Sequence, residues 1–133
     1  MQLRVNRAWP AILTVFVMTA SAAAPAAACG IADVCTAVTN SFYGHVQLDG
    51  VVATWSTEDE DEDLYYVLKR YDCGDPSACS VEVAVIPRTG TCGTTGSYQV
   101  VDDPPGPASA WTYTLEVWRE TNVRACAIDT VPQ

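Results

Sequence analysis

The sequence predicts a small all-β domain that is stabilised by disulfides. Hydrophobic and polar residues alternate with a period of two over residues 111–118, which is typical of a strand with one buried face. Five further runs, rich in Val, Tyr, Trp or Thr, are separated by Gly, Pro, Asp or Ser: 46–57, 64–71, 81–86, 98–101 and 123–131. No segment shows a convincing amphipathic helix. Several short strands at this spacing, with six cysteines, favour an all-β sandwich or barrel.

The first 28 residues have the order of a secretory signal peptide. Arg4 and Arg7 precede an apolar run over residues 8–20, and the small-residue tract ASAAAPAAAC follows. The apolar run is too short for a membrane span, which needs about 20 residues. Cleavage after Ala22 and cleavage after Ala28 both fit the pattern. We therefore expect a signal peptide over residues 1–28 and one domain over residues 29–133.

The charge of the chain restricts its partners and location. Removing residues 1–28 leaves five basic residues against sixteen acidic ones, a formal charge of −11. Such a surface repels nucleic acid and anionic membranes, so we expect neither as a partner. We expect an extracellular, periplasmic or cell-surface protein without a membrane span.

All six cysteines follow the apolar run, and their even number indicates three disulfides: Cys29, Cys35, Cys73, Cys79, Cys92 and Cys126. Their spacing is too loose for zinc, and His45 is the only histidine. Acylation of Cys29 would leave five thiols, an odd number. Lipidation is therefore the less favoured reading of Cys29.

Residues 38–131 resemble the fibronectin type III-like modules of bacterial secreted proteins. The family's V-x-L-x-W-x-T strand, acidic turn and Y-x-x-x-R strand match the segment VVATWSTEDEDEDLYYVLKR. The segments VAVIPRTG, SYQVVDD and WTYTLEV are similar to later motifs of the family. The matching positions in the first part are Val51, Ala53, Trp55, Thr57, Glu58, Glu60, Tyr65, Tyr66, Leu68 and Arg70.

The resemblance implies an immunoglobulin-like sandwich of about seven antiparallel strands. Trp111 stands where the family usually has a corner tyrosine, so we expect an altered or absent corner hydrogen bond. The side chains expected to face inward are Trp55, Leu68, Val83, Val85, Tyr113, Leu115 and Val117. The implied topology also places Cys73 and Cys79 on one hairpin. For the other four cysteines it favours the disulfides Cys35–Cys126 and Cys29–Cys92. The alternative set, Cys29–Cys35 with Cys92–Cys126, stays open.

Six consecutive carboxylates form the most unusual stretch: Glu58, Asp59, Glu60, Asp61, Glu62 and Asp63. Clustered carboxylates can bind calcium, but the run lacks the glycine and the spacing of an EF-hand loop. A run of like charges is most often a solvated loop. We therefore expect a solvated loop without a structural role and no cofactor, with calcium or polysaccharide binding as the alternative.

The chain lacks the common catalytic motifs, and His45 is expected on a surface or edge strand, so we expect no enzymatic activity. The alternation of the strand places Trp118 on the face opposite Leu115. We therefore expect Trp118 to be partly exposed beside Arg119, as a contact site for a partner. Two roles stay open. One is a binding module for a protein or a polysaccharide. The other is a subunit of an extracellular or envelope assembly that contacts neighbours, or copies of itself, through sheet edges and Trp118.

Overall fold

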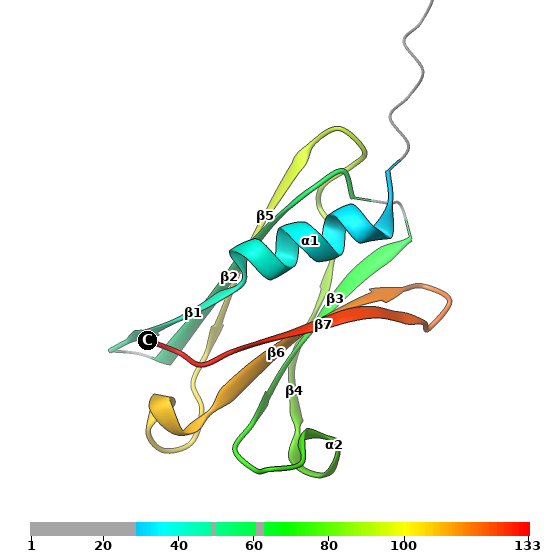
Figure 1. Cartoon of the computed structure of the whole chain (residues 1–133). Coiled ribbons are helices and arrows are strands. Elements are labelled where there is room, and N and C mark those ends of the chain that lie inside the picture. Colours follow the sequence, from blue (N-terminus) through cyan, green and yellow to red (C-terminus); the bar gives the residue numbers. More distant parts are fainter. Residues whose placement is uncertain (1–28, 49, 61–62) are drawn as a thin grey trace, which may run out of the picture.

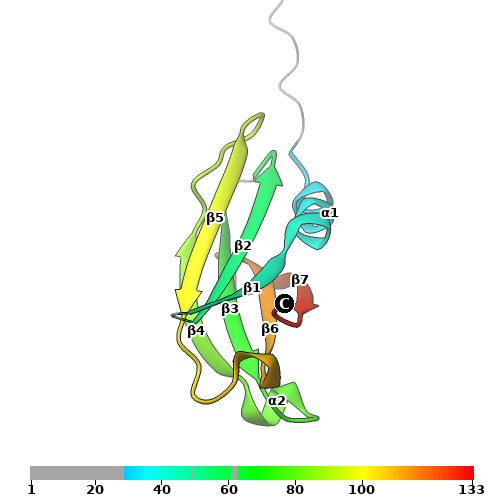
Figure 2. The same cartoon turned by 90° about the vertical axis from the view of Figure 1, so that its left-hand side faces the viewer.

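The computed structural model describes residues 29–48, 50–60 and 63–133. Seven strands form two antiparallel sheets that face each other (Figure 1 and Figure 2). One sheet has the order β1-β2-β5 and the other the order β4-β3-β6-β7. These findings confirm the predicted all-β sandwich. The predicted signal peptide and the residues Asp61 and Glu62 lie outside the described residues.

The predicted runs 64–71, 81–86, 111–118 and 123–131 match strands to within one residue, whereas the run 46–57 covers parts of two strands and the run 98–101 lies within a longer one. The bounds of the strands are β1 (Tyr43–Gln47), β2 (Gly50–Glu58), β3 (Leu64–Tyr71), β4 (Val81–Pro87), β5 (Thr95–Asp102), β6 (Thr112–Arg119) and β7 (Arg124–Thr130). Gly50 begins β2 with a φ of 132°, and a Cβ there would lie 2.2 Å from the carbonyl oxygen of Asp102. Only glycine fits this close approach of two backbones.

A helix at the start of the domain corrects the expectation of no amphipathic helix. α1 (Ile31–Ser41) buries Val34 and Val38, which are one helical turn apart. It packs against β2 and β7, which belong to different sheets, and lies along one side of the sandwich (Figure 1). Ser41 Oγ accepts a hydrogen bond from Ser56 N at 3.0 Å, which attaches the end of α1 to β2.

One expected core residue faces solvent because β4 contains a bulge. The pairing of β3 with β4 shifts register between Leu68 and Lys69. A bulge adds one residue to a strand, so the side chains after it change face. Val83 is therefore partly buried and Ile86 packs on the core, whereas Val85 is 54% exposed. The other expected core residues are buried: Trp55, Leu68, Tyr113, Leu115 and Val117.

Aromatic rings from both sheets meet in the core. Trp55 of β2 and Tyr98 of β5 stack with their ring centroids 5.1 Å apart. Tyr66 of β3 reaches Tyr98 from the other sheet, at 4.9 Å between centroids. Phe42, which follows α1, contacts the edge of Trp55. Burying such rings contributes about 1.5–3 kcal/mol each before the entropy of ordering is subtracted.

Three disulfides join the cysteines in the pairs that the implied topology favoured. Cys35 on α1 pairs with Cys126 on β7, with their Cα atoms 6.2 Å apart. The Cα atoms of Cys29 and Cys92 lie 5.7 Å apart. Cys73 pairs with Cys79, the last residue of the short helix α2 (Pro76–Cys79), across the connection between β3 and β4. Because Cys29 is in a disulfide, its sulfur cannot carry a lipid in this state.

The corner before β6 is altered rather than absent. A short 3-10 turn, η1 (Ala108–Ala110), precedes Trp111. The indole Nε1 of Trp111 donates a hydrogen bond to the carbonyl oxygen of Pro105 at 3.0 Å. The guanidinium of Arg70 lies 5.2 Å from the ring centroid of Trp111. An indole thus forms a hydrogen bond to the upstream backbone, where immunoglobulin-like sandwiches often have a tyrosine hydroxyl.

Candidate interaction surface on the four-stranded sheet

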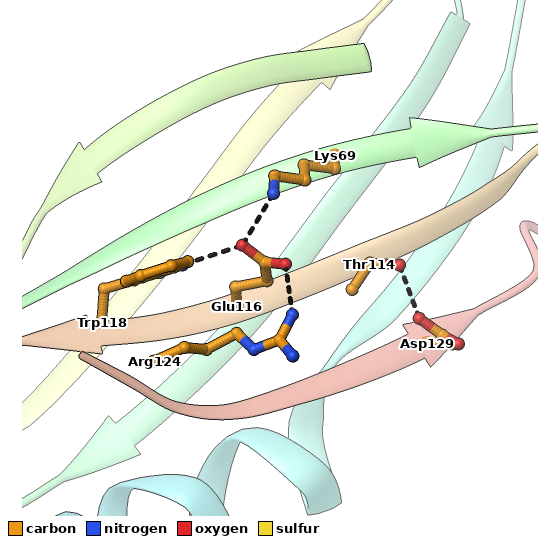
Figure 3. Close-up of polar contacts among 6 residues, drawn as sticks. All are labelled: Lys69, Thr114, Glu116, Trp118, Arg124 and Asp129. Atoms are coloured by element: carbon orange, nitrogen blue, oxygen red, sulfur yellow. Dashed lines mark hydrogen bonds and ion pairs between the residues drawn. The ribbon is translucent and has the colours of Figure 1, made fainter. Parts of the chain in front are cut away.

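The outer face of the four-stranded sheet carries an organised group of polar and aromatic side chains. Strand alternation places Leu115 and Val117 in the core and Glu116 and Trp118 on the opposite face. Cross-strand pairing then brings Lys69 of β3 and Arg124 of β7 beside them. Figure 3 shows these side chains lying together over three neighbouring strands. We call this group, with Tyr65, the outer-face cluster.

Glu116 is the centre of the outer-face cluster. Its carboxylate lies 3.0 Å from Lys69 Nζ and 3.0 Å from Arg124 Nη1, and it accepts a hydrogen bond from Trp118 Nε1 at 2.8 Å (Figure 3). The Glu116 side chain is only 5% exposed although it lies on the outer face. Its neighbours cover it with their aliphatic and aromatic parts. The indole of Trp118 is thereby held in one orientation.

The charge state of Glu116 follows from these contacts. Burial alone would raise the pKa of this carboxyl group. The hydrogen bonds from Lys69, Trp118 and Arg124 outweigh burial and lower the pKa below its ordinary value. Glu116 is therefore ionised at neutral pH and keeps both cations close.

Trp118 is partly exposed, as expected, but it is not isolated. It stacks on Tyr65 of β3, with ring centroids 6.4 Å apart and an angle of 17° between the ring planes. The two rings together form an aromatic patch beside the charged side chains. Aromatic residues that are held rigidly in this way lose little conformational entropy when a partner binds.

A hollow of about 510 Å³ adjoins the outer-face cluster. Its lining includes Lys69, Ser77, Thr114, Arg124 and Asp129. Asp129 accepts a hydrogen bond from Thr114 Oγ1 at 2.5 Å (Figure 3) and a second one from the hydroxyl of Tyr71 at 3.2 Å. The rim of the hollow thus offers both charges and hydroxyl groups to a partner.

Arg119 does not point into this cluster. Its guanidinium forms two hydrogen bonds of 2.8 Å with the two carboxylate oxygens of Asp63. Asp63 also accepts a backbone hydrogen bond from Glu120 N. Arg119 therefore joins the start of β3 to the end of β6, and the expected pairing of Trp118 and Arg119 at one contact site is not what the geometry shows.

The acidic run is not a uniform solvated loop, because Glu60 is fully buried. Its carboxylate accepts hydrogen bonds from the hydroxyls of Thr57, Tyr66 and Tyr98, which come from both sheets. Burial, and then the hydrogen bond to Glu60, raise the pKa of Tyr66 and of Tyr98. A Cβ on Gly90 would lie 2.2 Å from Glu60 Oε2, so the glycine makes room for the carboxylate. Glu60 is thus a structural group of the core.

The other described acids of the run also lie apart. Glu58 is exposed, Asp59 accepts a hydrogen bond from Gly93 N at 2.7 Å, and Asp63 binds Arg119. Within the described residues, the only group of potential metal ligands is Cys29, Asp59 and Cys92, and its two cysteines form a disulfide. The four described acids of the run thus lie in separate surroundings, and Asp61 and Glu62 lie outside the described residues.

No local pattern in the sequence indicated the buried network around Glu60 or the partners of Glu116. Alternation alone placed Trp118 and Glu116 on one face. The contacts with Lys69 and Arg124 depend on strand order, which a single sequence does not contain. His45 lies exposed on the edge strand β1, where it was expected.

Comparisons with known proteins give no family for this chain. No family model, no curated protein and no solved structure matches it. The helices of the described residues include none that is long and apolar enough to cross a membrane.

Proposed function

We propose that this chain is an exported, non-catalytic binding module that contacts another protein through the outer-face cluster. The partner belongs to the cell surface or to an extracellular or envelope assembly. The observation that carries the proposal is the stacked pair of Trp118 and Tyr65, fixed by the buried carboxylate of Glu116. Tryptophan, tyrosine and arginine dominate the binding energy of protein interfaces, and here they lie side by side.

The low entropy cost of ordering the outer-face cluster also supports binding. The indole of Trp118 is already oriented by Glu116, so a partner does not have to order it. Arg124 is 53% exposed and uses Nη1 for Glu116, which leaves further N–H groups at the rim. The arrangement has an aromatic centre and a polar border, which is the usual anatomy of a protein interface.

The fold is consistent with a fibronectin type III-like module, which we propose as its family. The strand orders β1-β2-β5 and β4-β3-β6-β7 support this assignment, whereas Trp111 in place of the corner tyrosine departs from the pattern of the family. Three disulfides are typical of domains that fold in an oxidising compartment. The charged and apolar order of residues 1–28 supports export.

A catalytic role has little support from the core carboxylate. Glu60 is 0% exposed and is enclosed by Thr57, Tyr66 and Tyr98, so a substrate does not reach it. General acid or base catalysis requires contact with the reacting atoms. The proposal is therefore confined to binding.

The proposal is tested by capture of partners with matched variants. Immobilised wild-type protein is incubated with the envelope fraction and the culture fluid of the source cells, and bound proteins are identified by mass spectrometry. We expect Trp118→Ala to lose the captured partner and Tyr43→Ala to keep it, since Tyr43 is 43% exposed on β1, away from the cluster. Circular dichroism confirms that both variants fold. Capture of the same proteins by wild type and by Trp118→Ala contradicts the proposal.

A further inference from the structure

The strand β5 differs from the other edge strands of the sandwich. Natural proteins protect edge strands by pairing, bulges, prolines or charges, because unpaired backbone groups attract other strands. β1 is covered by Gln133, whose backbone bonds Val46 N at 2.9 Å and Gly44 O at 3.1 Å. β4 has a bulge, an exposed Glu82 and a terminal Pro87.

β7 is protected in a similar way. It has a bulge opposite Val117 and Trp118, charged residues at Arg124 and Asp129, and a disulfide to α1. β5 has no bulge and no proline, and the carboxylate of its one charged residue, Asp102, is bound by Arg70. It pairs with β2 without a register shift from Thr95 to Asp102. It lies at the side of its sheet away from α1 (Figure 2).

The open part of β5 is residues 97–102. The connection from β4 passes close to the start of the strand, since a Cβ on Gly90 would lie 3.3 Å from Gly96 N. From residue 97 on, β5 shares backbone hydrogen bonds with β2 alone among the described residues. The side chains of Ser97, Gln99 and Val101 are uncharged and exposed, and Val101 is 61% exposed. We call residues 97–102 the open edge.

Acidic side chains stand near both ends of the open edge. Glu58 of β2 is paired with Thr95, just before the edge begins, and Asp103 follows the edge directly. Both side chains are exposed, and neither has a hydrogen bond or an ion pair within the described part of the chain. Six residues of strand extend over about 20 Å.

We propose that the open edge of β5 accepts an extended segment of another protein as an additional strand. The segment is uncharged and rich in Thr and Val at its centre and has Lys or Arg at both ends. The backbone ladder would supply affinity, and the basic ends would pair with Glu58 and Asp103. This surface is separate from the outer-face cluster, so it does not depend on the function proposed above.

A second copy of this chain fits the open edge less well. Symmetric antiparallel pairing of two β5 strands about Gln99 would place Asp103 of one copy opposite Thr95 of the other. Asp103 would then lie in one cross-strand row with Glu58 of the other copy, with Thr95 between them. Two strongly acidic molecules would thus bring like charges together, which is destabilising. A basic partner removes this repulsion.

The test uses the oxidised protein and a synthetic peptide of alternating Thr and Val with Lys at both ends. Matched peptides carry Glu at both ends or N-methyl groups on alternate amides. At low salt we expect the Lys peptide to bind about tenfold more tightly than the Glu peptide. The N-methylated peptide should not bind, and hydrogen exchange of the amides of residues 97–102 should slow down with the Lys peptide alone.

Two lysine variants provide the control within the protein. Val101→Lys should weaken binding of the Lys peptide about tenfold, because it places a cation on the open edge. Val123→Lys should leave binding unchanged, since Val123 is 57% exposed in the turn between β6 and β7. The proposal is overturned by absence of binding, by equal binding of the Glu or N-methylated peptide, or by protection outside β5. Sedimentation of the peptide-free protein as a dimer that Val101→Lys dissociates would show that a second copy occupies the edge.

Discussion

Glu60 and Glu116 are both buried carboxylates, but they have opposite surroundings. Glu60 accepts hydrogen bonds from three neutral hydroxyls that belong to both sheets. Glu116 is held by two cations and an indole within one sheet. The first therefore connects the two layers of the core, and the second organises a surface. The role of an acid in this domain therefore depends on the side chains that strand pairing brings to it, not on the number of acids beside it in the sequence.

The largest effect is expected from Glu60. Glu60→Ala leaves the hydroxyls of Tyr66, Tyr98 and Thr57 without their acceptor and opens a void, so we expect the free energy of unfolding to fall by about 3–5 kcal/mol. Urea denaturation measures this change. Glu58→Ala, in the same run but exposed, should change it by less than about 0.5 kcal/mol. Equal effects of the two variants would show that the run is a solvated loop after all.

We expect a smaller effect on stability from Glu116 than from Glu60, and we expect it to depend on pH. Its pKa in the folded protein is lowered from the ordinary value of 4.5. The stability that it contributes is therefore complete above the unfolded pKa and is lost as the pH falls through the folded pKa. We expect the difference in melting temperature between wild type and Glu116→Gln to be largest at neutral pH and to decrease in acid. A difference that is constant from pH 7 to pH 2 would contradict the assigned ionisation of Glu116.

The smallest effect is expected from the exposed ion pair at the end of β6. Asp63 and Arg119 are 36% and 30% exposed, so water screens the pair. Asp63→Ala should lower the free energy of unfolding by about 0.5 kcal/mol, and less in 1 M salt. The same urea titration checks it, with Glu60→Ala as the reference for a buried acid. A loss as large as that of Glu60→Ala would remove the distinction between buried and surface acids of the run.

The strands were predictable because one buried face leaves a period of two in the sequence. The runs 64–71 and 81–86 differ from β3 and β4 by at most one residue. α1 was missed although Ile31, Val34, Cys35 and Val38 have helical spacing, because the segment is short and contains few strong helix formers. The helix is stabilised by packing against both sheets and by the disulfide of Cys35.

Two other features could not be predicted from local patterns. Val85 has the alternation of an inward residue, but the bulge that reverses its face depends on pairing with β3. Glu60 lies in a run of acids, and its burial depends on hydroxyls that arrive from β2, β3 and β5. A run of charges predicts a solvated loop because burying an isolated charge costs free energy. The hydrogen-bond donors that offset this cost for Glu60 are brought together only by the tertiary structure. Long-range contacts of this kind leave no periodic signal in a single sequence.

The spacing of the disulfides sets an order in which the molecule can be completed. Cys29 and Cys35 lie 63 and 91 positions before their partners, whereas Cys73 and Cys79 are six positions apart. In a chain that emerges with its N-terminus first, the small loop can close while most strands are still absent. The link from α1 to β7 has to wait for the seventh strand. Cys29 can pair as soon as Cys92 has emerged, before β5, so the thiol of Cys35 stays without its partner for longest.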